Sequence, residues 1–203
     1  MQKIMFNDKY GLTKAVLEGR KTQTRRIAGY CDSPDITAKD VSLHKCDFGS
    51  CYCHLKKVIH KEAAFRIGHD IAVAQPYRDV CGYYEQEYEI GKDLEEELKV
   101  HKGYNNKMFV AAGLMPHRIR ITNIRVERLQ DISDGDCMAE GIQQYPDVHS
   151  YMWGFSFIRR EALRVELSPT PREAYANLID KICGKGTWEK NPFVFVYEFK
   201  LVR

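Results

Sequence analysis

Hydrophobic positions along the first part of the chain follow two periods, which predict a strand and then a short helix. The apolar residues within 3–6 favour a strand, and those within 10–18 recur at the spacing of a helical face. Gly19 directly after this stretch is typical of a helix end. We expect the polar segment 22–26 that follows to be extended.

The second half of the chain carries longer patterns. The alternation over 117–129 changes parity near Thr122 and Asn123, which predicts a β-bulge in a long strand. A proline in the first turn and an apolar stripe predict a helix over 171–183. Residues 193–201 alternate aromatic side chains with valines, and the first half is apolar on both faces. That pattern favours a central strand.

Weaker signals predict three shorter elements. A strand is expected at 70–74, and a short helix is expected after Ser133, a residue suited to the helix cap, with Gly141 at its end. The acidic and aromatic segment 83–100 contains one further short, exposed helix around 94–98. We interpret this segment as a solvated insertion or as a surface for a protein partner.

Composition is that of a globular protein. The chain has 203 residues, 44% of them hydrophobic and 29% charged, which favours one domain over 1–203 with insertions at about 30–66 and 78–107. No apolar run approaches the roughly 20 residues that span a bilayer. The first residues lack the apolar stretch of a signal peptide, so the cytoplasm is the expected compartment.

Charge is distributed unevenly although the formal net charge is only +3. Residues 1–66 contain 13 Lys or Arg against seven Asp or Glu, whereas residues 78–99 contain three against eight. Blocks of opposite sign predict a basic face for a phosphate-bearing partner and an acidic insertion elsewhere.

Metal and cofactor signals are sparse. The candidate zinc ligands lie in one short segment: His44, Cys46, Cys51, Cys53 and His54. Their spacing lacks paired C-x-x-C knuckles, and free thiols in a loop are the alternative interpretation. Phosphate-loop, dinucleotide and H-E-x-x-H patterns are absent from the sequence, so we expect no cofactor.

Four cations and two hydroxyls gather between Gly19 and Arg26, directly after the first predicted helix. If the segment is extended, then Thr22, Thr24 and Arg26 share one face, while Lys21 projects from the turn. The cluster is either a solvated basic loop or an anion-binding site.

The same segment resembles the G-x-K-x-x-E-x-R signature of the ASCH family, with Gly19, Lys21 and Arg26 at three signature positions. Two further blocks, within 125–142 and 188–199, resemble phage-associated members of that family. The resemblance implies an α+β protein with a PUA-like β-barrel, flanking helices and loop insertions. It also implies RNA or a modified nucleoside as the partner.

One departure from the signature carries a functional implication. Thr24 stands where many members have Glu, as in an ASCH branch that hydrolyses the amide of N4-acetylcytidine with a Lys, a Thr and a more distant Glu. Lys21 and Thr24 match the first two, and Glu140 is a looser match for the third. The chemistry agrees, because a lysine of lowered pKa can activate a threonine hydroxyl and a carboxylate can handle the proton passed to the leaving amine.

Binding residues follow from the same resemblance. Arg20, Arg25 and Arg26 are expected to grip phosphate or substrate. Another departure lies at 74–77, where relatives have an Arg–Glu pair and a Trp, and where Tyr77 offers a surface for stacking a base. The alternatives left open are a non-catalytic RNA-binding protein, an endoribonuclease and a phage accessory protein that acts through protein contacts.

Overall fold

The computed structural model describes residues 1–28, 63–88, 92–146, 153–157 and 167–202. The candidate zinc ligands at 44–54 and most of the insertion predicted at 30–66 lie outside these residues. None of the described helices has the length and apolar character needed to cross a membrane.

A five-stranded mixed sheet is the centre of the fold. Its strands, in their order across the sheet, are β1 (Lys3–Ile4), β3 (Asp70–Val73), β4 (Arg118–Arg128), β7 (Phe193–Val202) and β2 (Gln23–Ile27). Only the β1–β3 pair is parallel, and the other three pairs are antiparallel. The α+β class is therefore confirmed.

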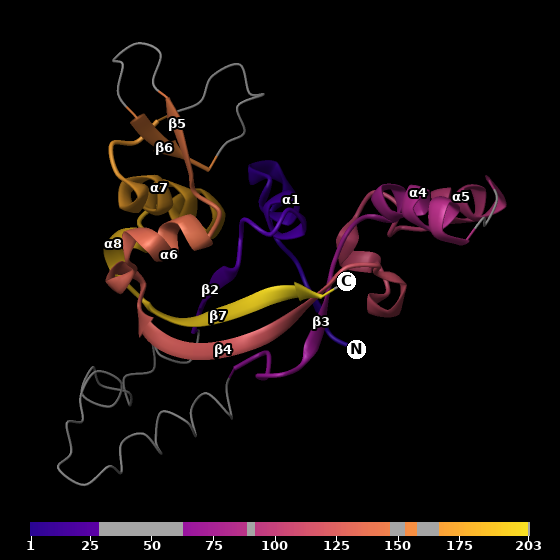
Figure 1. Cartoon of the computed structure of the whole chain (residues 1–203), viewed down its shortest axis with the longest axis horizontal. Helices are drawn as coiled ribbons and strands as arrows, with labels where there is room; N and C mark the ends of the chain where they lie inside the picture. Colours follow the sequence, from indigo (N-terminus) through magenta and orange to yellow (C-terminus); the bar gives the residue numbers. More distant parts are fainter. Residues whose placement is uncertain (29–62, 89–91, 147–152, 158–166, 203) are drawn as a thin grey trace, which may run out of the picture.

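Strands β4 and β7 form the long, curved spine of the molecule, as Figure 1 shows. Their register shifts between Ile121 and Asn123, so the predicted β-bulge is confirmed. The bulge returns Ile124 to the buried side after Ile119 and Ile121, which explains the change of parity in the sequence. Strand β7 is central, as predicted, because it pairs with both β4 and β2.

Closure of this sheet into a barrel stays a prediction. Strands β1 and β2 are its outer members, and no pairing between described strands joins them.

Most of the longer helices lie at the two ends of the spine, and α1 lies between them. They are η1 (Asp8–Tyr10), α1 (Leu12–Leu17), α4 (Tyr77–Tyr88), α5 (Lys92–Lys99), η2 (Lys107–Phe109), η3 (Ala112–Leu114), η4 (Leu129–Asp131), α6 (Asp134–Ala139), α7 (Pro171–Cys183) and α8 (Thr187–Lys190). Figure 1 shows α6, α7 and α8 at one end, and α4 and α5 at the other. Helix α7 has the predicted bounds, and Ser133 caps α6 as expected, its hydroxyl accepting from the Asp136 amide.

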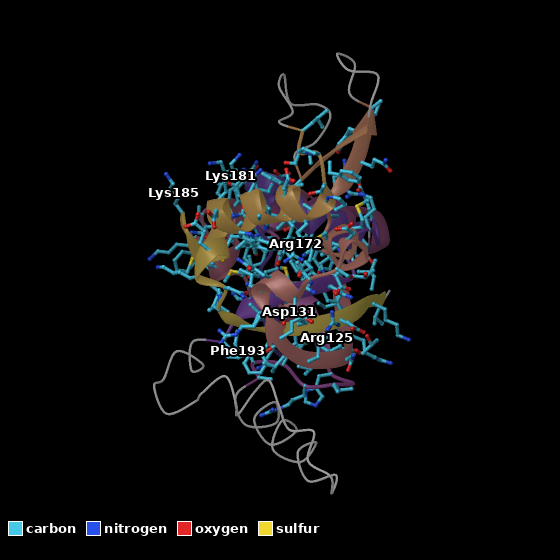
Figure 2. The ribbon with its side chains drawn as sticks, turned by 90° about the vertical axis from the view of Figure 1, so that its left-hand side faces the viewer. Arg125, Asp131, Arg172, Lys181, Lys185 and Phe193 are labelled. Atoms are coloured by element: carbon cyan, nitrogen blue, oxygen red, sulfur yellow. The ribbon has the colours of Figure 1, made fainter. Side chains whose placement is uncertain are left out.

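The larger hydrophobic core lies between the sheet and the helices α1, α6 and α7. Arg172 of α7, labelled in Figure 2, ties this layer together because its guanidinium donates to the Ile132 carbonyl at 3.0 Å and to the Gln130 carbonyl. The strand predicted from its aromatic residues, β7, contributes to this core, because Phe193, Phe195 and other side chains of β7 are buried in it.

A second, smaller core joins α4 to β3 and to the turns around Met115. The sequence did not predict α4, whose first residue is Tyr77, although α5 agrees with the short helix expected around 94–98. Strands β5 (Gln143–Pro146) and β6 (Trp153–Ser156) form a separate two-stranded sheet that was not predicted either.

Candidate functional site

A pocket of about 460 Å³ opens where β2 meets α1, the end of α6 and α7. Its polar lining consists of Asn7, Lys21, Thr24, Arg25, Arg26, Glu140, Tyr175 and Cys183. The remaining wall is apolar, with Leu178, Ile179 and Ile182 from the stripe of α7 and Met5, Phe6, Leu12 and Ile27 from the first part of the chain. The volume lies within the range of about 300–1,000 Å³ that is usual for small-molecule sites.

Backbone turns fix the position of Lys21. Gly19 has φ of +73°, a left-handed conformation that suits glycine, and the amides of Arg20 and Lys21 both donate to the Ala15 carbonyl at 2.9 Å. The Thr22 amide then donates to the Ala139 carbonyl at 2.9 Å. Residue 21 is thereby held between the ends of α1 and α6, where the sequence placed it after a helix-ending glycine.

Lys21 and Glu140 form a buried ion pair at the base of the pocket. Lys21 Nζ donates to Glu140 Oε2 and, at 2.8 Å, to the Glu140 carbonyl oxygen. The two residues are only 2% and 4% exposed. Burial lowers the pKa of Lys21 below its usual value, against the opposing attraction of the Glu140 carboxylate.

Arg25 holds the other side of the Glu140 carboxylate. Its Nη1 donates to Glu140 Oε1 at 3.1 Å, and its Nη2 donates to Glu127 at 2.6 Å and to Asp136 at 2.9 Å. Burial opposes the charged form, but the carboxylates raise the pKa of Arg25 above its usual value. The predicted role of Arg25 in gripping phosphate therefore needs correction, because its guanidinium is committed to three carboxylates of the protein.

A second arginine extends this network across the sheet. Arg125, labelled in Figure 2, donates to Asp136 at 2.7 Å, to Glu127 at 2.9 Å and to Glu198. Gln23 also donates to Asp136 at 3.0 Å. These contacts join β2, β4, β7 and the first turn of α6, so they hold against the sheet the short helix that Glu140 follows.

Thr24 lies on β2 opposite Tyr197 of β7 and is 5% exposed. It lines the same pocket as Lys21 and Glu140, and Thr22, two residues earlier, is exposed. The structure thus brings together the three residues that the sequence grouped as catalytic.

Two of the predicted binding residues, Arg26 and Arg20, differ in whether they line the pocket. Arg26 lines the pocket and is exposed, and its Nη2 donates to the Met5 carbonyl at 2.7 Å. Arg20 does not line this pocket and pairs with Glu18 on the surface.

Tyr77 belongs to the smaller core rather than to the pocket. It is buried, and its hydroxyl accepts from the Ala111 amide at 2.9 Å. The expectation that Tyr77 stacks a base at this site is therefore corrected. The motif position had suggested an open aromatic surface, but the unpredicted α4 turns the ring inward.

Sequence reasoning missed Phe6 and Tyr175. Lys21 Nζ lies 5.9 Å from the centroid of the Phe6 ring, and Arg25 lies 6.0 Å from that of Tyr175. Tyr175 was recognised only as part of the apolar stripe of α7. Its hydroxyl is a buried side-chain polar atom with no hydrogen-bond partner among the described residues, which no periodicity could indicate.

Comparisons of the chain with family profiles, with curated proteins and with solved structures return no match. The site is therefore interpreted from its own residues. It combines a hydroxyl, an amine of lowered pKa and a carboxylate held by two cations, which together can support general base and nucleophilic chemistry.

Proposed function

We propose that the chain is an amidohydrolase that removes the acyl group from an N-acylated pyrimidine nucleoside such as N4-acetylcytidine, on an ASCH-type, PUA-like barrel. One observation carries the proposal. Lys21 and Thr24 line the same pocket as Glu140, which lies 119 positions from Lys21 in the chain, and all three residues are buried. That convergence is what the chemistry requires and what a solvated basic loop would not need.

In the proposed reaction, Lys21 first loses its ammonium proton to solvent, a loss that its lowered pKa favours. The Thr24 hydroxyl then attacks the acyl carbon while the neutral amine of Lys21 takes the hydroxyl proton. The C–N bond then breaks, and the proton passes through the Lys21–Glu140 pair to the leaving nitrogen. The acyl group stays on Thr24 as an ester. Water attacks this ester, releases the carboxylic acid and returns a proton to the Thr24 oxygen.

Burial supports the assignment of Lys21 as the base. An exposed lysine is protonated at neutral pH, with a pKa of about 10.4, and cannot accept a proton. Lys21 is buried in the pocket and its pKa is lowered. Glu140 orients the amine, and Arg25 in turn fixes Glu140 from the other side.

The test is deacetylation of N4-acetylcytidine, followed by chromatography of the cytidine released. We expect Thr24→Val to abolish turnover and Thr24→Ser to retain part of it, because serine keeps the hydroxyl. Thr22→Val is the matched control, since it makes the same substitution at an exposed position two residues away. Melting temperatures of all three variants establish that they are folded.

Two outcomes would overturn the proposal. One is a native protein that releases no cytidine from N4-acetylcytidine or from its longer-chain acyl analogues. The other is a folded Thr24→Val variant that hydrolyses the amide as fast as the native protein does.

A second candidate function is binding of RNA or a modified nucleoside without turnover. One contact supports a Lys21 that does not act as a base: Lys21 Nζ also donates to the carbonyl of Glu140, the C-cap residue of α6. A lysine in that position stabilises a helix terminus without any chemistry. Binding of short RNAs with neither deacetylation nor RNA cleavage would favour this candidate, and cleavage would indicate a ribonuclease.

A further inference from the structure

Positive charge exceeds negative charge in the lining of the pocket. Among the described residues that line it, three are cations, Lys21, Arg25 and Arg26, and one is a carboxylate, Glu140. Lys21 and Arg25 both form ion pairs with that carboxylate. Arg25 also forms ion pairs with Glu127 and Asp136, which do not line the pocket. The inner cations are therefore neutralised by the protein.

Arg26 differs from the inner cations. No carboxylate of the described residues lies within ion-pair distance of it, and its hydrogen bond to Met5 goes to a neutral carbonyl. It is exposed, so its guanidinium keeps donors for another group. Three exposed apolar side chains, Met5, Ile27 and Ile182, line the pocket as well.

The outer cation and the inner amine are close enough for one small ligand to contact both. Lys21 Nζ and Arg26 Cζ lie 5.9 Å and 6.0 Å from the centroid of the same Phe6 ring. They are therefore at most about 12 Å apart, and both residues line the same pocket. Guanidinium groups are well suited to bind phosphate through paired hydrogen bonds.

We infer that Arg26 binds a phosphate of the ligand, so that the pocket takes a pyrimidine nucleotide unit in preference to the free nucleoside. The identity of the base rests on the proposed function, whereas the phosphate contact does not. A 5′-monophosphate and the phosphodiester of an RNA chain present the same anionic oxygens to Arg26.

The experiment is calorimetric titration of the native chain with cytidine, with cytidine 5′-monophosphate and with a cytidine dinucleotide. A charged hydrogen bond favours the monophosphate over cytidine by about 10-fold or more. We expect Arg26→Met to remove this preference and Arg26→Lys to retain part of it. Arg20→Met is the control, because it removes a neighbouring arginine that lies outside the pocket.

The arms of the experiment separate the sources of the phosphate. Tighter binding of the dinucleotide than of the monophosphate points to RNA, and equal binding points to the mononucleotide; both support the contact at Arg26. Cytidine that binds as tightly as its monophosphate overturns the inference, as does a preference that survives in Arg26→Met or the absence of any binding.

Failure of this inference and failure of the proposed hydrolase are distinguishable. If N4-acetylcytidine is hydrolysed but the phosphate brings no gain in affinity, the hydrolase stands and the phosphate contact does not. If no amide is cleaved but the preference for the monophosphate disappears in Arg26→Met, the contact stands alone. If both hold, Arg26→Met lowers kcat/KM for the acetylated nucleotide more than for the acetylated nucleoside.

Discussion

At the scale of residues, the buried pair of Lys21 and Glu140 determines how the site responds to substitution. The charges compensate each other where water is nearly excluded. Removing one member leaves an uncompensated charge, which is costly in a protein interior.

Glu140→Gln is expected to lower the free energy of unfolding by about 3 kcal/mol, because it leaves the Lys21 ammonium buried beside a neutral amide. Adding Lys21→Met to Glu140→Gln is expected to recover part of that loss. Urea unfolding measures both. The control is Glu18→Gln on the surface, where loss of an exposed pair is worth less than about 1 kcal/mol. If Glu18→Gln and Glu140→Gln lost the same free energy of unfolding, the prediction would be contradicted.

The pH dependence of kcat/KM tests the role of Lys21. Because the base form of Lys21 is needed, the rate is expected to rise with pH and to level off below the usual lysine pKa of about 10.4. Glu140 opposes the lowering of that pKa, so the residual rate of Glu140→Gln should level off at a still lower pH. An unchanged or higher inflection in the variant would argue against Lys21 as the base.

Tyr175→Phe is expected to leave the free energy of unfolding unchanged or to raise it by about 1 kcal/mol, because the hydroxyl is buried without a partner among the described residues. Tyr197→Phe is the matched control. The hydroxyl of Tyr197 accepts from the Ala64 amide at 3.0 Å, so its removal should cost about 1 kcal/mol. Thermal or urea unfolding compares the two variants. A larger loss of unfolding free energy in Tyr175→Phe than in Tyr197→Phe would contradict the prediction.

Sequence alone grouped Lys21, Thr24 and Glu140 because a motif fixes the local spacing of two of them and a resemblance suggested the third. It assigned Arg25 to phosphate because a cationic run does not reveal its partners. Those partners, Glu127 on β4 and Asp136 on α6, are more than 100 positions away and are brought near only by the tertiary fold.

At the scale of elements, the strongest periodicities were the ones that predicted correctly. Helix α7 has a proline in its first turn and an apolar stripe, and β7 has an aromatic residue or leucine at every second position from 193 to 201. Helix α4 was missed because its acidic and aromatic residues were interpreted as part of a solvated insertion. Strands β5 and β6 have only four residues each, too few for a reliable pattern.

Two Gly→Ala substitutions test how turns position these elements. Gly141 follows α6 with φ of +105°, so Gly141→Ala should lower the free energy of unfolding by about 1–2 kcal/mol. Gly82 lies inside α4, and an added Cβ there meets no atom within 4 Å. Gly82→Ala should therefore raise the free energy of unfolding by about 0.5–1 kcal/mol. Urea unfolding measures both variants. If both substitutions changed the free energy of unfolding in the same direction, this explanation would be contradicted.

At the scale of the whole molecule, the sequence predicted the α+β class but not the arrangement of its layers. Strand order β1-β3-β4-β7-β2 depends on contacts between distant segments, which local periodicity does not encode. The same is true of the division into two hydrophobic cores, which places α4 and Tyr77 away from the pocket. The pocket itself depends on this arrangement, because α6 and α7 complete the wall that β2 begins.

The most direct test of the account is the deacetylation rate in a set of single and double variants: Lys21→Met, Thr24→Val and the two combined, each compared with Thr22→Val. If Lys21 and Thr24 act as one catalytic unit, each single variant should lose nearly all activity and the double variant should lose no more. Thr22→Val should retain the native rate. Substantial activity in a folded Lys21→Met or Thr24→Val variant, or losses that multiply in the double variant, would contradict the account.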